Sequence, residues 1–265
     1  MAVAKNEEPN ALEELLKKNE EEKKTIAAAK MDRWQISSNV APIYFSSASN
    51  GSPIDGQFSE NSKSYENNLS FGLGVNYAVN KKISVRTGVN KFTLGYNTND
   101  IVFFAALDQA GFSNLATSNA GSTIQVISMN NTEAMRPFDS SIQNTNEGVM
   151  TQKMGYFEVP MEVSYKLVDK KFGIDVIGGV STLFLNENEV SVSSSLMSAS
   201  LGKANNLNDI HFSTNVGLGF RYRFWKSFEA NFEPMFKYQI NTFNKDDGNF
   251  KPYFVGLYSG VSFKF

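Results

Sequence analysis

The stretch HFSTNVGLGFRYRF, residues 211–224, alternates between two kinds of side chain over its whole length. Its even-numbered positions, from Phe212 to Phe224, are mostly apolar or aromatic, whereas its odd-numbered positions are polar or glycine. A period of two indicates a β-strand with one apolar and one polar face. Ordinary strands have about five to six residues, but a tilted strand needs about 9 to 11 to cross the hydrocarbon of a bilayer. This stretch is long enough to do so.

The same alternation recurs after Trp34 and divides the chain into long amphipathic segments. We predict eight strands, at residues 34–46, 66–80, 83–97, 152–167, 171–186, 209–224, 227–241 and 252–265. The third segment is the least regular, because its apolar residues change parity between Val89 and Phe92. A β-bulge near Asn90 and Lys91 would produce such a change, and we predict one there.

The connections between these segments are alternately short and long. VNKK (79–82), VDKK (168–171) and FWKS (224–227) are tight turns, whereas residues 47–65, 98–151, 187–208 and 242–251 are long and polar. Outer-membrane barrels have short periplasmic turns and longer outer loops. The predicted fold is therefore all-β, an eight-stranded antiparallel up-and-down transmembrane β-barrel. We expect it in a bacterial outer membrane, with the short turns and both termini periplasmic and the long loops outside.

The composition agrees with such a barrel and excludes several other classes. Aromatic residues make up 13% of the chain, which is high for a soluble domain. No apolar run approaches the roughly 18 residues of a transmembrane helix. The net charge of -2 provides no basic excess for nucleic acid. The absence of cysteine excludes disulfides and thiolate metal sites.

The polar faces of the predicted strands carry charges of both signs. Side chains fill the interior of an eight-stranded barrel, and buried charges there must pair. We predict a structural network in the lumen made by Arg86, Glu158, Glu162, Lys166, Asp175, Arg221, Arg223, Glu229, Glu233 and Lys237. Aromatic residues gather beside the short turns, where an interfacial girdle would lie: Trp34, Tyr77, Tyr165, Phe172, Phe224, Trp225, Phe228, Phe263 and Phe265.

The first 33 residues differ from the remainder. Glu13 and Lys17, like Glu14 and Lys18, are favourable helical pairs, but the apolar stripe ends at Leu16. We therefore divide the chain into a charged helical or linker segment at 1–33, expected in the periplasm, and a barrel at 34–265. This segment lacks the apolar core of a secretory signal, so we expect either that a signal was removed or that a longer protein precedes it.

The end of the chain, GVSFKF, resembles the C-terminal signal that the barrel assembly machinery reads in outer-membrane proteins, through Gly260, Phe263 and Phe265. GYFEVPMEVSYKL and PYFVGLYSGVSFKF resemble the outer-membrane β-barrel domain family, which includes the PorT-like barrels. WQISSNVAPIYFSS, NGSPID and NSKS are most similar to the C-terminal barrel of anti-sigma factors that span both membranes. This resemblance implies a barrel that anchors and senses, with a signal relayed through the linker.

Two other functions remain open. One is a structural or adhesive outer-membrane barrel without a signalling role. The other is a water-soluble ligand-binding barrel of the lipocalin type, which would require an apolar lumen rather than a charged one. The expected partners are outer-membrane lipid, the barrel assembly machinery and a periplasmic or cell-surface ligand, but not nucleic acid.

No constellation of residues predicts an enzyme, a cofactor or a metal site. His211 is the one histidine, and at the loop end of a strand it is better explained as a polar lumen residue than as a catalytic base. Glu158 and Glu162 lie four residues apart on one strand, a rise of roughly 13 Å that prevents them from sharing a proton. DDGN at 246–249 lacks the spacing of a calcium loop and predicts a turn.

Overall fold

The structure is a computed structural model that describes residues 33–106, 111–119, 121–131, 145–244 and 246–265. The predicted helical or linker segment at 1–33 therefore lies almost entirely outside the described residues. In the part of the chain that is described, no helix combines the length and the apolar character needed to cross a membrane.

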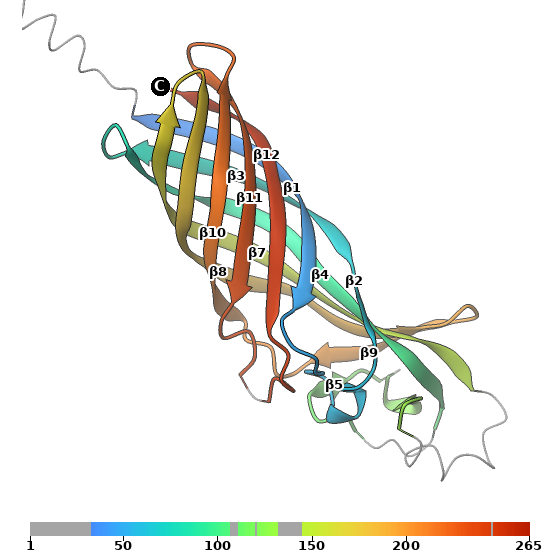
Figure 1. Ribbon diagram of the computed structural model, residues 1–265. Helices are drawn as coiled ribbons and strands as arrows, with labels where there is room; N and C mark the ends of the chain where they lie inside the picture. Colours follow the sequence, from blue (N-terminus) through green and yellow to red (C-terminus); the bar gives the residue numbers. More distant parts are fainter. Residues whose placement is uncertain (1–32, 107–110, 120, 132–144, 245) are drawn as a thin grey trace, which may run out of the picture.

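Eight long strands form a closed antiparallel ring (Figure 1), which confirms the predicted fold class. Each strand pairs with the next along the chain, and the last pairs with the first. The ring consists of β1 (Trp34–Ser47), β3 (Asn67–Ala78), β4 (Ile83–Ala105), β7 (Asn146–Asp169), β8 (Phe172–Ser193), β10 (Ile210–Arg223), β11 (Phe228–Gln239) and β12 (Pro252–Lys264). The seam that closes it extends to the last residue, because the backbone amide of Phe265 donates to the Trp34 carbonyl at 2.9 Å.

Shorter elements occupy the end of the ring that carries the long connections. They are η1 (Gly56–Phe58), β2 (Lys63–Tyr65), β5 (Leu115–Thr117), η2 (Gly121–Thr123), β6 (Ile124–Ser128) and β9 (Ser198–Ala204). β2 and β6 both pair with β4, and β9 pairs with β8 and β5. Strands β4, β7 and β8 also extend beyond their predicted ends. The long connections are thus partly β-structure rather than open loop.

The predicted bulge at Asn90 and Lys91 is wrong. The register between β4 and β7 continues without a shift from Asn90 opposite Glu158 to Thr98 opposite Met150. A register shift does occur in β4, but between Thr98 and Ile101. The apolar residues change parity because the interior changes character along the strand, so that inward positions are polar before Lys91 and apolar after it.

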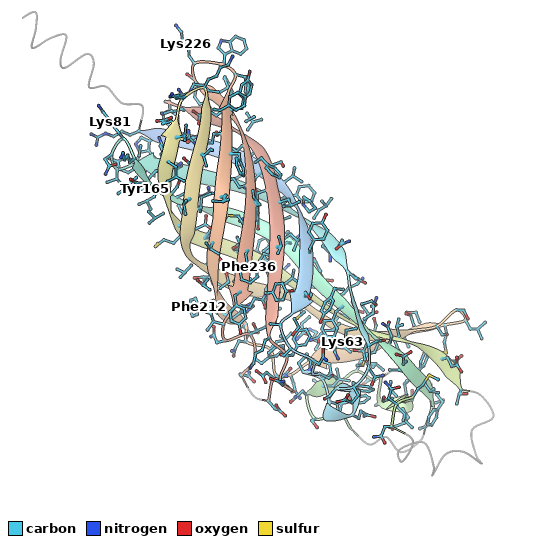
Figure 2. All side chains as sticks on the ribbon, viewed as in Figure 1. Lys63, Lys81, Tyr165, Phe212, Lys226 and Phe236 are labelled. Atoms are coloured by element: carbon cyan, nitrogen blue, oxygen red, sulfur yellow. The ribbon has the colours of Figure 1, made fainter. Side chains whose placement is uncertain are left out.

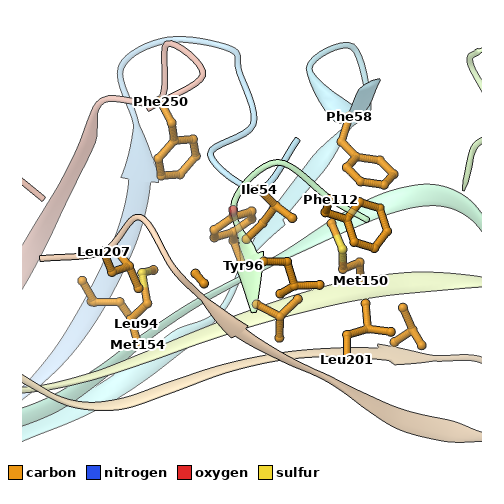
Figure 3. Close-up of a cluster of buried hydrophobic side chains, with 14 of the residues drawn as sticks. Ile54, Phe58, Leu94, Tyr96, Phe112, Met150, Met154, Leu201, Leu207 and Phe250 are labelled. Carbon is orange, nitrogen blue, oxygen red and sulfur yellow. The ribbon is translucent and has the colours of Figure 1, made fainter. Parts of the chain in front are cut away.

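An apolar cap fills the barrel at the long-loop end and continues into the connections beyond the ring (Figure 3). We use the name "apolar cap" for the largest cluster of buried hydrophobic residues. Inward side chains of the ring contribute Ile43, Phe45, Phe92, Leu94, Tyr96, Met154, Tyr156, Leu183 and Phe254. The connections add Ile54, Phe58, Phe112, Leu115, Ile124, Val126, Leu201, Leu207 and Phe250. The sequence did not predict this cap, because every apolar residue of a strand was assigned to the outer face.

Candidate functional site: lipid-facing belt and charged interior

The outer face of the ring is apolar and exposed, whereas the charged side chains are buried inside. Phe71 and Phe232 are 59% and 45% exposed on the outer face, while Glu158 and Arg221 are 0% and 9% exposed. A water-soluble barrel would have the opposite arrangement, because exposing a continuous apolar surface to water is unfavourable. The belt therefore matches a barrel surrounded by lipid.

Residues of the predicted aromatic girdle form several ring contacts at the short-turn end. Trp34 packs on Tyr77 with ring centroids 4.8 Å apart, and Phe172 packs on Tyr222 at the same separation. Phe263 stacks between Phe228 and Phe265. Aromatic rings of this kind lie at the membrane–water interface, so they mark one boundary of the belt.

The most deeply buried ion pair in the described residues joins Lys237 of β11 to Glu158 of β7. Asn90 of β4 donates a further hydrogen bond to the Glu158 carboxylate at 3.0 Å. The Lys237 ammonium also lies 5.0 Å from the centre of the Tyr258 ring, a distance typical of a cation–π contact. Three strands around the lumen are thus joined through one carboxylate.

Arg86 of β4 bridges two carboxylates near the middle of the barrel. Its Nε lies 3.0 Å from Glu162 Oε2, and its Nη2 lies 2.6 Å from Glu233 Oε2. Asn215 of β10 donates a hydrogen bond to the other Glu162 oxygen at 2.9 Å. Glu162 therefore has two partners, while Arg86 is the ion-pair partner of Glu233 in the described residues.

A third group of charges lies toward the short-turn end. Arg221 donates two hydrogen bonds to Asp175, at 2.6 and 2.9 Å, in the bidentate arrangement that suits a guanidinium and a carboxylate. Arg223 pairs with Glu229 at 3.0 Å and with Asp169 at 3.3 Å. Guanidinium groups of β10 thus connect β8, β11 and the last residue of β7.

The structure brings together all ten charged residues predicted for the lumen, each in at least one ion pair. Sequence reasoning missed Asp169, because it assigned the residue to the turn VDKK, whereas Asp169 is the last residue of β7. It also missed Asn90, Asn215 and Gln35, which bind the carboxylates as neutral partners. Their place on the polar parity of their strands was the available signal.

The interior leaves little free space. A polar cavity lies beside Arg86 and Glu233. The volume that the centre of a water molecule can occupy in it is about 70 Å³, enough for only a few water molecules. Glycines allow this close filling: a Cβ on Gly72 would collide with the Asn90 amide, and one on Gly217 would collide with the Met235 sulfur. Between the charged region and the long-loop end, the apolar cap also fills the interior of the barrel.

The other candidate residues have structural contacts in the described part of the chain. His211 is buried, and its ring meets that of Tyr156 edge-on at 4.9 Å. Asp246 and Asp247 accept hydrogen bonds from the backbone amides of Gly248 and Asn249, as in a turn. The described residues include no group of three or more acidic or histidine side chains placed to hold a metal ion.

The predicted assembly signal lies on β12 beside the closing seam. Gly260 faces Asn39 across the seam, and a Cβ there would collide with the Ser38 carbonyl. Phe263 and Phe265 project outward and are both about half exposed. The aromatic pair therefore belongs to the girdle described above.

The chain is similar to several solved structures and to one sequence family. Solved structures that resemble this chain include Neisserial surface protein A (10% identity, 88% of this chain and 97% of that chain, TM-score 0.43). Ail of Yersinia pestis (13%, 89% and 100%, 0.39) and the N-terminal β-barrel domain of Pseudomonas aeruginosa OprF (9%, 87% and 97%, 0.35) are also similar. No curated protein sequence matches the chain. A family profile described as the outer membrane protein beta-barrel domain matches residues 22–241, so this chain belongs to that family.

Proposed function

We propose that this outer-membrane barrel is a non-conducting anchor and sensor rather than a pore or an enzyme. One observation carries the proposal: the interior is filled twice along its length, by the charged network and by the apolar cap. A pore requires a continuous aqueous path, whereas the free volume beside Arg86 holds only a few water molecules.

The orientation that we propose places the short turns and both ends of the barrel in the periplasm. Figure 1 supports it, since β1 starts and β12 ends beside the three short turns, and the long connections gather at the opposite end. The segment before Trp34 would then leave from the periplasmic end, where it can connect the barrel with something inside the cell envelope.

The sensing role rests on the resemblance to the barrels of anti-sigma factors that span both membranes. In this proposal a periplasmic or cell-surface ligand, or a failure of barrel assembly, changes the barrel and the linker relays that change inward. The apolar cap is compatible with a surface role, because it packs the connections that carry Phe58, Phe112 and Phe250 onto the long-loop end of the barrel.

The second candidate is a structural or adhesive barrel without signalling. It is favoured by the extension of β7 and β8 with β9, which forms a hairpin projecting from the barrel (Figure 1). Such an extension could present a surface to a partner directly. Both candidates share lipid as a partner and assembly through Gly260, Phe263 and Phe265.

Two measurements test the anchor. Purified protein in planar bilayers should give no stepwise conductance, and cell fractionation should recover it only with detergent. Steady channels, or native protein in the aqueous fraction, would refute the proposal. To separate the two candidates, residues 34–265 can be deleted from the gene in the source bacterium. Signalling predicts altered transcription of one sigma-factor regulon, whereas a structural role predicts no such change.

A further inference from the structure

The two ends of the barrel carry opposite charge. Beyond the lumen network, the long-loop end has four lysines against ten carboxylates among the described residues. The lysines are Lys63, Lys153, Lys203 and Lys251, and the carboxylates are Asp55, Glu60, Glu66, Asp100, Glu147, Glu187, Glu189, Asp209, Asp246 and Asp247. The short-turn end has an excess of cations, and Figure 2 shows two of its lysines, Lys81 and Lys226, at the end opposite Lys63.

These cations form what we call the basic rim: Arg33, Lys81, Lys82, Lys170, Lys171 and Lys226. All six are exposed, and none of them forms an ion pair within the part of the chain that the structure describes. The one acidic residue in the sequences VNKK, VDKK and FWKS is Asp169, at the end of β7, and it is already paired with Lys166 and Arg223. Within the residues that the structure describes, the rim is therefore a set of positive charges without ion-pair partners around one end of the barrel.

Contacts with the aromatic girdle fix the height of the rim relative to the membrane. The Lys82 ammonium lies 6.0 Å from the centre of the Tyr165 ring, and that of Lys171 lies 5.5 Å from the Tyr222 ring. Arg33 donates a hydrogen bond to the Tyr77 hydroxyl at 3.2 Å. Because girdle aromatics lie at the level of the lipid headgroups, cations held against them lie at that level too.

We propose that the basic rim binds anionic phospholipid headgroups in the leaflet that faces the short turns. The inference rests on the proposed membrane function and adds a lipid preference to it. A lysine beside an anionic membrane surface contributes about 1 kcal/mol, which corresponds to about fivefold enrichment of an anionic over a zwitterionic lipid at one contact. The acidic long-loop end offers no such attraction, so the preference belongs to one leaflet.

The two tryptophans of the chain make the rim directly observable. Trp34 and Trp225 both lie at the short-turn end, and the chain has no other tryptophan. The full chain is reconstituted in equimolar phosphatidylglycerol and phosphatidylcholine, with bromine on the acyl chains of one lipid at a time. Bromine quenches only the tryptophans that it touches. We expect stronger quenching by brominated phosphatidylglycerol, equivalent to about fivefold local enrichment, and loss of the difference in high salt.

The rim variant K81Q/K82Q/K170Q/K171Q should lose this enrichment, whereas the control K153Q/K203Q, at the opposite end, should retain it. Equal quenching by the two lipids, or unchanged enrichment in the rim variant, would overturn the inference. Enrichment that arises only after Glu7, Glu8, Glu13, Glu14 and Glu20 to Glu22 are changed to Gln would also overturn it, because the N-terminal segment would then occupy the rim. Insertion is checked separately by heat-dependent gel mobility, so failure to insert would instead refute the membrane function.

Discussion

Replacing Lys237 with methionine removes the cation from the most buried ion pair described in the barrel. Methionine keeps much of the aliphatic length of lysine, so the packing against Tyr258 and Phe254 is largely retained. Glu158 then remains in the lumen, completely buried, with the neutral Asn90 amide and Ser181 hydroxyl as its remaining described hydrogen-bond donors. Breaking a buried pair by removing one partner typically costs about 3–5 kcal/mol.

Protonation of Glu158 limits this cost. Glu158 can escape the penalty by taking up a proton, and for an ordinary glutamate pKa of about 4.3 that costs about 4 kcal/mol at pH 7.4 and about 1.6 kcal/mol at pH 5.5. The destabilisation of K237M should therefore be about 3–4 kcal/mol at pH 7.4 and should fall below about 2 kcal/mol at pH 5.5. The double variant E158Q/K237M has no unpaired charge, so its stability should lie within about 1 kcal/mol of the wild type.

Denaturant unfolding in lipid vesicles, followed by the fluorescence of Trp34 and Trp225, measures these differences. The control is Lys153→Met, which removes an exposed lysine from β7 and should change the free energy of unfolding by less than about 0.5 kcal/mol. The reasoning fails if K237M is as stable as the control at pH 7.4, or if the double variant is no more stable than K237M.

Three further outcomes follow from other contacts. Glu233→Gln should lower the free energy of unfolding by less than about 1 kcal/mol, because Arg86 keeps its ion pair with Glu162. Arg86→Met leaves both carboxylates without this cation, so it should lower the free energy of unfolding by at least about 3 kcal/mol in the same assay. Gly72→Ala should destabilise by about 1–3 kcal/mol through collision with the Asn90 side chain, and the second change Asn90→Ala should relieve that part of the strain but not the 2.9 Å contact with the Val89 carbonyl. In the loop before β12, the hydrogen bond from Lys251 lowers the pKa of the Asp247 carboxyl, so Lys251→Met should raise that pKa in an NMR titration.

The strands and the lumen charges could be predicted because each residue of a membrane barrel faces one of two very different environments. Alternation along β10 identifies the outer face, and charges on the other parity identify the lumen. The apolar cap could not be predicted in this way. Phe92, Leu94 and Tyr96 are apolar and face inward, so the parity rule interpreted them as a slip in the strand.

The extensions of β7 and β8 show a second limit of prediction from the sequence. Val190 and Val192 alternate with Ser191 and Ser193, but no apolar outer face accompanies them, and their pairing with β7 joins segments well apart in the sequence. The contacts of Asp169 are of the same kind, because Arg221 and Arg223 reach it from a different hairpin. Contacts between residues far apart in the sequence cannot be predicted from the alternation of side chains along one strand.

The charged lumen also explains how the barrel selects one register. A shift of one residue between neighbouring strands would turn apolar side chains inward, so the lipid excludes it. A shift of two residues keeps every face correct, and the lipid-facing belt does not oppose it. Such a shift moves the partners by about 6.6 Å, which would separate Lys237 from Glu158 and place side chains over the space left by Gly72 and Gly217. Buried ion pairs add little net stability, so we infer that their main contribution here is to penalise the two-residue shifts that lipid tolerates.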